Sequence, residues 1–345
     1  MLRTLFIVCL SVVHASALVV GSASQPSPWR DPSPHQVRRV TVDSSVQLEV
    51  LDWGGSGLPI VLLACYVSAH VYDDFAPKLA RGFRVYGITR RGIGASDKPA
   101  AGYAVQRSAD DVLEVLDALK IQKSILVGHS CAGQVLTLFA AQHSDRLQGL
   151  VYLDGASDPT MTPKDVGESM PDPASLPRPI KPPAPPDNRS FAALRASQQN
   201  ARGWAFPEAE LRQQFAANPD GSVGAPMLSP VIRRAITIDA RMKPDYSRVR
   251  VPVLAIYQRE LPFEQVAARF AITNEQERAA LRQEYAVARA LYVRWQGDLL
   301  AGVPTARIVE MPGAGLYMFL SNEGDVIGEI YRFATGQPEG QAAPA

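Results

Sequence analysis

Short, wholly apolar segments alternate along this chain with longer amphipathic ones, and this alternation constrains the fold more than any other feature. A run such as residues 60–63 has no polar face, so it fits a strand that is covered on both sides. An alternating pair around a polar turn at residues 43–45 predicts an opening antiparallel hairpin. The sequence therefore predicts an α/β fold in which helices flank a mostly parallel central sheet. The predicted strands are 39–42, 46–51, 59–63, 83–88, 123–127, 150–153, 251–257 and 307–311.

Helical periodicity fills the gaps between these strands. Apolar residues from 112 to 119 share one face, and Ser108 with Asp111 predicts a capping box at the start of that helix. The longest helix is predicted to open at Thr273 and Gln276 and to end at Gly302. Its stripe of Leu, Tyr, Ala and Trp has helical spacing, so we interpret it as core packing.

The segment 158–248 departs from this alternation. Its prolines at 171–186 exclude regular helix and central strand there. An irregular helical insertion between two strands predicts a cap over the crevice at the strand ends. The predicted organisation is therefore a core formed by 25–157 and 249–337, interrupted by a proline-rich helical cap at 158–248. Short helices are predicted within the cap near 191–199, 207–216 and 229–238.

The two ends of the chain have their own signatures. Residues 1–24 carry one charge, Arg3, followed by an apolar run and small residues, which is the pattern of a signal peptide. We therefore expect a secreted or periplasmic protein that has no membrane contact after cleavage. The polar residues 338–345 predict a disordered tail. A net charge of +1 and the lack of a basic run argue against a nucleic-acid partner, and no Cys/His cluster predicts a metal site.

Residues 124–133, SILVGHSCAG, carry the strongest chemical motif. A strand is predicted to end at Gly128, with Ser130 on a tight turn and a helix beginning at once. Such a turn strains the serine backbone and requires small residues two places before and after it, which Gly128 and Ala132 supply. The unpaired N–H groups of the helix N-terminus favour negative charge beside the hydroxyl. Ser130 is therefore the predicted nucleophile.

The strand, tight turn and helix around Ser130 form the pattern of a nucleophile elbow. With this elbow, the chain resembles the α/β-hydrolase superfamily from about residue 36 to 335. Residues 57–66, GLPIVLLACY, look like its strand and oxyanion loop, with Ala64 and Cys65 where His-Gly is usual. Residues 90–97, RRGIGASD, are similar to its glycine turn after the fourth strand. The resemblance implies a serine esterase-like hydrolase without cofactor that acts on a small apolar or ester-type molecule. It also implies an oxyanion hole formed by the backbone N–H groups of Tyr66 and Cys131.

The resemblance leaves two candidates for the acid that orients the base. Asp154 follows the strand at 150–153, where some members of the superfamily carry their acid. Glu260 lies just beyond the strand at 251–257, which is the more usual location, although the expected spacing places Leu261 there. We prefer Asp154 and keep Glu260 as the alternative.

The family pattern fails at the base. Relatives carry a histidine after the last strand, where this chain reads MPGAGLYM at 311–318 and Leu316 occupies the matching position. The histidines of the chain are His14, His35, His70, His129 and His143, so no shift of alignment in this loop recovers one. His70, four residues after Tyr66, is the candidate substitute base, and the neighbour His129 is a weaker one.

A serine hydroxyl is a poor nucleophile without a base, and removing the histidine of a comparable triad costs on the order of 10⁶ in turnover. Two hypotheses follow: an acyl or ester hydrolase of weak or altered activity, or a non-catalytic pseudoenzyme that binds a small ligand on the same scaffold. Cys65 and Cys131 both flank the predicted oxyanion hole, so a disulfide between them is a further hypothesis. Nothing in the sequence indicates an oligomeric state.

Overall fold

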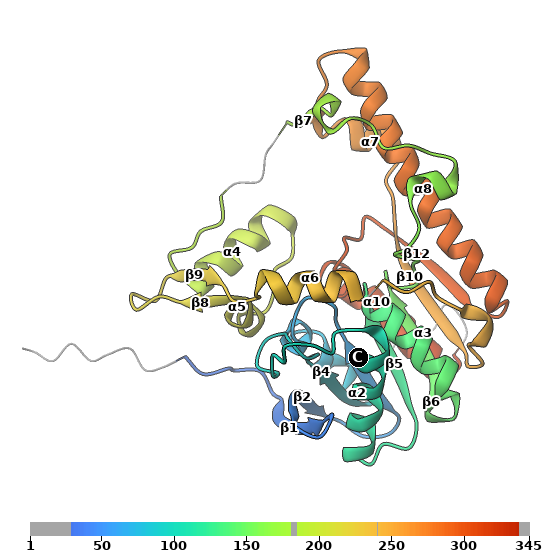
Figure 1. Ribbon diagram of the computed structural model, residues 1–345. Helices are drawn as coiled ribbons and strands as arrows, with labels where there is room; N and C mark the ends of the chain where they lie inside the picture. The colour runs from blue at the N-terminus through green and yellow to red at the C-terminus, as the bar shows by residue number, and fades with distance from the viewer. Residues whose placement is uncertain (1–28, 181–184, 240, 338–345) are drawn as a thin grey trace, which may run out of the picture. The chain divides into compact units, whose positions relative to one another are not determined.

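The computed structural model describes residues 29–180, 185–239 and 241–337 (Figure 1). The chain clusters into two compact units, 1–32 and 33–345, and the fold described below belongs to the second. The predicted signal peptide at 1–24 and the predicted tail at 338–345 lie outside the described residues. In the described ranges, no helix combines the length and the apolar character needed to cross a membrane.

An eight-stranded sheet forms the centre of this unit. Its strands are β1 (Gln36–Val42), β2 (Val46–Gly54), β3 (Pro59–Leu63), β4 (Arg84–Ile88), β5 (Ser124–His129), β6 (Leu147–Leu153), β10 (Val253–Arg259) and β12 (Arg307–Pro312). They lie in the order β1-β2-β4-β3-β5-β6-β10-β12. Pairing is antiparallel from β1 to β4 and parallel from β4 to β12, which confirms the predicted hairpin and mostly parallel sheet.

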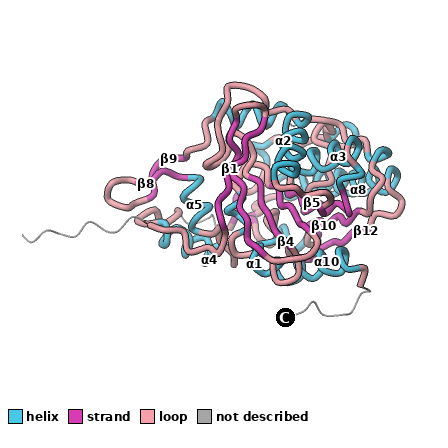
Figure 2. The backbone as a smooth tube through the Cα atoms, turned by 90° about the horizontal axis from the view of Figure 1, so that it is seen from below, coloured by secondary structure: helices cyan, strands magenta, loops and turns pink. Residues whose placement is uncertain are grey.

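Two apolar cores, one on each face of the sheet, explain why the strands have no polar side. In β3, Val61 and Leu63 join one core, whereas Ile60 and Leu62 join the other. Figure 2 shows helices on both sides of the strands. The first face is covered by α2 (Val105–Ala118), α3 (Ala132–Gln142) and the end of α8 (Glu275–Gly302), and the second by η1 (Ala69–Tyr72), α1 (Ala76–Leu79), α9 (Met318–Ser321) and α10 (Glu323–Thr335).

The start of α2 differs from the prediction. The helix begins at Val105 after Ala104, so Ser108 and Asp111 lie inside it and form no capping box. Asp111 instead turns inward, where its carboxylate accepts two hydrogen bonds of 2.7 Å from the Arg91 guanidinium. A tertiary ion pair thus accounts for an acidic residue that looked like a local helix signal.

The start of α8 differs by one residue. Asn274, rather than Thr273, caps this helix by accepting a hydrogen bond of 2.9 Å from the Glu277 N–H. The predicted end at Gly302 is confirmed.

Replacing Asp111 with asparagine is expected to lower the free energy of unfolding by about 2–3 kcal/mol. Both partners of the pair are buried, with side-chain exposures of 1% for Arg91 and 5% for Asp111. Removing one member of a buried pair costs about 3–5 kcal/mol, but Asp43 remains 3.3 Å from Arg91 and offsets part of the loss. Denaturant unfolding measures the change. Glu114→Gln, in the more exposed pair with Arg107, is the control and should cost about 1 kcal/mol or less.

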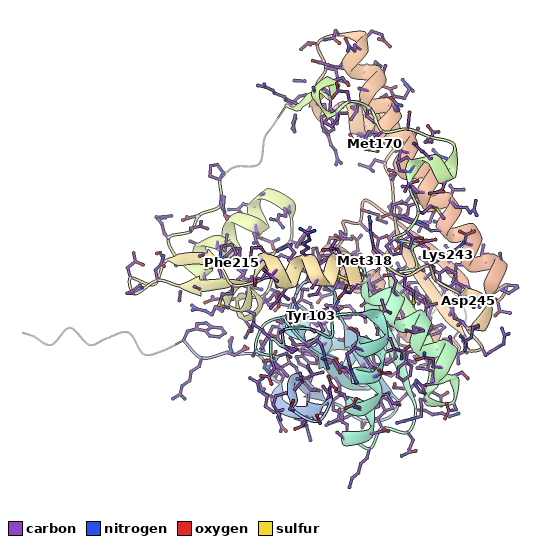
Figure 3. All side chains as sticks on the ribbon, viewed as in Figure 1. Tyr103, Met170, Phe215, Lys243, Asp245 and Met318 are labelled. Atoms are coloured by element: carbon purple, nitrogen blue, oxygen red, sulfur yellow. A yellow bond between two sulfur atoms is a disulfide. The ribbon has the colours of Figure 1, made fainter. Side chains whose placement is uncertain are left out.

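The insertion at 158–248 divides into two parts. The first comprises η3 (Pro163–Val166), η4 (Pro173–Ser175) and β7 (Arg178–Pro179), and Figure 3 shows Met170 of this part beside α8. β7 pairs with β11 (Phe270–Ala271), and Gln283 on α8 donates a hydrogen bond of 2.8 Å to the Ser169 carbonyl. This proline-rich part therefore lies along the excursion that contains α7 (Phe263–Ala267) and α8.

The second part packs on the core. It comprises α4 (Phe191–Arg202), α5 (Glu208–Gln214), β8 (Phe215–Ala217), β9 (Val223–Pro226) and α6 (Pro230–Asp239). Phe191, Leu194, Phe206 and Leu211 are buried in the core that also contains η1. This second part alone forms the cap.

Candidate active site

The turn between β5 and α3 raises Ser130 out of the sheet. Ser130 has a φ of 54°, in the left-handed region that is costly for a residue with a side chain. Its N–H donates a hydrogen bond of 3.1 Å to the carbonyl of Leu153, which ties the turn to the end of β6. A Cβ atom at Gly133 would lie 1.8 Å from the carbonyl oxygen of Gly155, so this helix start touches the loop after β6. Close packing of three segments thus holds the serine.

The predicted oxyanion donors follow two neighbouring parallel strands. Tyr66 follows β3 and Cys131 follows β5, and within the described residues neither backbone N–H makes an intramolecular hydrogen bond. A disulfide joins Cys65 to Cys131, with a Cα–Cα distance of 5.3 Å. The covalent bond therefore links the oxyanion loop directly to the elbow.

Asp154 follows β6 and is bound by two neutral donors. Its carboxylate accepts hydrogen bonds from the Tyr292 hydroxyl, at 2.9 and 3.1 Å, and from Gln258 Nε2, at 3.4 Å. Burial raises the pKa of Asp154 to about 6, although the hydrogen bonds act to lower it. The sequence predicts only core packing for the stripe on α8, so the hydrogen bond from Tyr292 to Asp154 is not among the predictions. The signal was its hydroxyl, since a tyrosine near a core usually finds a polar partner.

Glu260, the alternative acid, lies one residue beyond β10. Burial raises its pKa, and nearby Arg289 acts in the opposite direction. Its Oε2 atom is buried and has no hydrogen-bond partner in the part of the chain that the structure describes. Among these residues, Glu260 forms no hydrogen bond with Ser130 or Asp154.

Leu316 lies in the loop between β12 and α9, and the residue is 44% exposed. Its carbonyl accepts a hydrogen bond of 2.9 Å from His129 Nε2, so residue 316 lies directly beside the elbow. Burial lowers the pKa of His129 to about 4, which keeps the imidazole neutral. Its Nδ1 atom is buried and unpaired among the described residues. His129 therefore positions the Leu316 loop, and among the described residues neither of its ring nitrogens forms a hydrogen bond with the Ser130 hydroxyl.

His70 lies in a separate buried cluster. Its Nδ1 is 2.8 Å from Asp73 Oδ2, and its Nε2 is 3.5 Å from Glu49 Oε1. The other oxygen of Asp73 contacts His35 Nδ1, at 2.8 Å, and Trp53 Nε1, at 3.1 Å. Both nitrogens of His70 thus face carboxylates, and the structure does not bring this candidate base together with Ser130.

A cavity of about 600 Å³ lies between the oxyanion loop and the cap. Its wall includes Tyr66, in the oxyanion loop, and Tyr317, which directly follows Leu316. Ser130 is not among the lining residues. The hydroxyl groups of Tyr66 and Thr237 on α6 share a hydrogen bond of 2.8 Å, so the cap touches the oxyanion loop. The lining also includes the apolar and aromatic residues Ile93, Phe206, Phe215, Met227 and Leu228 and the cations Lys98 and Arg233.

Glu210 of α5 fixes the cap to the oxyanion loop. Its fully buried carboxylate accepts hydrogen bonds from the hydroxyl and the N–H of Ser68, the latter at 3.1 Å, and from Gln214 Nε2, at 2.8 Å. Burial raises the pKa of Glu210 to about 7. Glu210 lies 142 residues after Ser68 in the chain, yet it holds this serine, which follows Tyr66 by two residues.

This carboxyl is expected to make stability fall as pH rises. Its folded pKa of about 7 lies above the ordinary 4.5, so the native state holds the proton more tightly. The contribution is complete below pH 4.5 and is lost as pH rises to 7, a change of about 3 kcal/mol. Unfolding measured from pH 4 to 8 should show this loss in the wild type, and the loss should be smaller by about 3 kcal/mol in Glu210→Gln, where the raised pKa of Asp154 still lowers stability as pH rises. Glu208→Gln, on the more exposed side of α5, should keep the wild-type profile; identical slopes for all three proteins would contradict the assignment.

Known proteins share parts of this arrangement. A family model described as alpha/beta hydrolase fold matches residues 54–223. The AB hydrolase superfamily protein YisY of Bacillus subtilis (strain 168) is 34% identical over 112 residues, which cover 31% of this chain and 41% of that protein. A soluble epoxide hydrolase of Corynebacterium sp. (strain C12) is 34% identical over 125 residues, 35% of this chain and 42% of the relative. The chain thus spans about two fifths of the length of these curated relatives.

Solved structures extend the likeness to most of the chain. The crystal structure of E-2-(acetamidomethylene)succinate hydrolase matches with a TM-score of 0.58. The matched region covers 87% of this chain and 99% of the hydrolase chain. Its sequence identity is 20%, so this likeness concerns the fold alone.

Proposed function

The chain belongs to the α/β-hydrolase superfamily, and from that premise we propose that Ser130 is the nucleophile of an acyl or ester hydrolase that is weak because it lacks an imidazole base. The proposed substrate is a small, apolar or ester-type molecule. The proposed place of action is outside the cytoplasm, and the Cys65–Cys131 disulfide supports this because such bonds persist in oxidising compartments.

The hydrogen bonds of Asp154 are the observation that carries the proposal. In a complete serine triad, the buried acid binds and orients a histidine. Here the carboxylate is occupied by Tyr292 and Gln258, neither of which can take a proton from a serine at neutral pH. Position 316 carries a leucine, so nothing at this place connects the acid to Ser130. The acid is satisfied without a histidine.

The remaining parts of the site support residual rather than efficient catalysis. The serine remains at the elbow, and two unpaired N–H groups can stabilise the transition state. A neighbouring cavity can bind the substrate. In a triad stripped of its members, such features leave about 10³–10⁴ of acceleration over water. We therefore expect slow turnover that still depends on Ser130.

A second candidate function is binding of a small ligand without turnover. The cavity of about 600 Å³ favours it, because its size lies within the range of about 300–1,000 Å³ for small-molecule sites. Its aromatic and apolar lining suits an apolar ligand.

The decisive experiment compares the wild type with Ser130→Ala. Short p-nitrophenyl esters should be hydrolysed slowly by the wild type and not above background by the variant. A fluorophosphonate should label Ser130 only over long incubation. Turnover above about 1 s⁻¹, in the range of ordinary enzymes, would refute the weak catalyst. Equal rates for the two proteins, together with saturable binding of an apolar ligand, would favour the second candidate.

A further inference from the structure

A guanidinium without an anionic partner lies against the disulfide. Arg90 Nη1 is 3.9 Å from Cys131 Sγ, while Nη2 reaches only neutral oxygens, Ser108 Oγ at 3.3 Å and the Tyr103 carbonyl at 3.4 Å. Its Nε atom is buried with no partner in the described chain. No carboxylate pairs with Arg90 there, because the neighbouring Asp111 is bound by Arg91. The sulfur atom thus faces a cation that has no ion-pair partner among the described residues.

The backbone adds a second favourable field at the same sulfur. Cys131 is the residue before the first turn of α3, an 11-residue helix, and the N-terminus of a helix stabilises a thiolate. Burial lowers the pKa of Arg90 to about 10, so the guanidinium is still charged at neutral pH. A negative charge on Cys131 would satisfy both the helix end and Arg90.

We propose that Cys65–Cys131 is a redox-active disulfide and that Arg90 holds Cys131 as a thiolate once the bond is reduced. The co-reactant is a dithiol. Cys131 is partly exposed whereas Cys65 is 2% exposed, so the incoming thiolate attacks Cys131 Sγ. The disulfide breaks, and its electron pair leaves on Cys65, which takes up a proton.

The second thiolate of the dithiol completes the exchange. It attacks its partner sulfur in the mixed disulfide, closes a cyclic disulfide and releases Cys131 as a thiolate beside Arg90. Two electrons pass from the dithiol to the protein; of the two protons released, one is held by Cys65 and one enters solvent. Because the bond links the oxyanion loop to the elbow, reduction frees the two donor segments from each other.

Thiol chemistry tests this directly and independently of ester hydrolysis. In Cys65→Ala, the ultraviolet absorbance of the Cys131 thiolate is titrated against pH, with alkylation and peptide mapping to exclude Cys9. We expect a pKa at least about one unit below the ordinary 8.5. The disulfide of the full chain is also equilibrated with dithiol buffers. Arg90→Met should shift that equilibrium about tenfold toward the disulfide, whereas Arg90→Lys, which keeps the charge, should shift it less.

The titration remains decisive even if Arg90→Met fails to fold, because it uses a protein that retains Arg90. A Cys131 pKa at or above about 8.5 would overturn the proposal. So would dithiol equilibria that agree within a factor of two in the wild type and a folded Arg90→Met. Neither result would bear on the weak hydrolase, whose test is the Ser130-dependent rate.

Discussion

Replacing Leu316 with histidine is expected to raise Ser130-dependent ester hydrolysis about a hundredfold or more. The carbonyl of this residue is held beside the elbow by His129, so a side chain here starts close to the serine. The leucine is 44% exposed, so an imidazole requires no repacking of the core. Because the histidine of a complete serine triad is worth on the order of 10⁶ in turnover, a partial recovery of this size is conservative.

The acid limits the gain. In the proposed triad, Asp154 would orient a histidine at 316, and that carboxylate is bound by Tyr292. Adding Tyr292→Phe removes this competitor, so the double variant should exceed Leu316→His by about a further tenfold. An imidazole base also works only when neutral, so the rates of both variants should rise with pH around about 6.5. The wild type should lack that titration.

Initial rates with p-nitrophenyl acetate between pH 5 and 8 measure these effects. Leu300→His is the matched control, because Leu300 is 41% exposed on α8 and an imidazole there should leave the rate unchanged. Ser130→Ala should abolish the gain in both variants. If folded Leu316→His and its double variant show no increase, residue 316 does not face the serine and the base position is misassigned.

The fold followed from the sequence because its signals are local. An all-apolar strand can only be buried on both faces, and β3 shows this with alternate residues in opposite cores. The elbow was equally local, since a strained turn requires the small neighbours that Gly128 and Ala132 provide. In both cases, the residues of one short segment are enough to predict the local backbone structure.

The partners of the site residues did not follow from the sequence, because they come from distant segments. Tyr292 binds Asp154 across 138 residues, and Glu210 binds Ser68 across 142. Ser108 and Asp111 suggested a helix cap, yet the Arg91 guanidinium competes more strongly for the carboxylate. A disulfide between Cys65 and Cys131 could be suggested only through the fold, because the pairing of β3 with β5 brings the ends of these two strands side by side.

Replacing Gly133 with alanine is expected to lower the free energy of unfolding by at least about 4 kcal/mol. The new Cβ would lie 1.8 Å from the Gly155 carbonyl oxygen and 2.5 Å from its carbon, both backbone atoms that no side-chain rotation can move. Overpacking usually costs about 1–3 kcal/mol when side chains can adjust, so a backbone clash should exceed that range. Denaturant unfolding monitored by circular dichroism measures the loss.

The clash at Gly133 should also disturb the acid, because Gly155 directly follows Asp154. The start of α3 can relieve the contact only by moving away from the loop that carries this carboxylate. Gly297→Ala separates this effect from helix propensity: Gly297 lies in α8 with no atom within 4 Å of an added Cβ, so alanine there should stabilise the protein by about 0.5–1 kcal/mol. Equal behaviour of the two variants would mean that the elbow and the Asp154 loop are not in contact, and the site assembled from them would have to be abandoned.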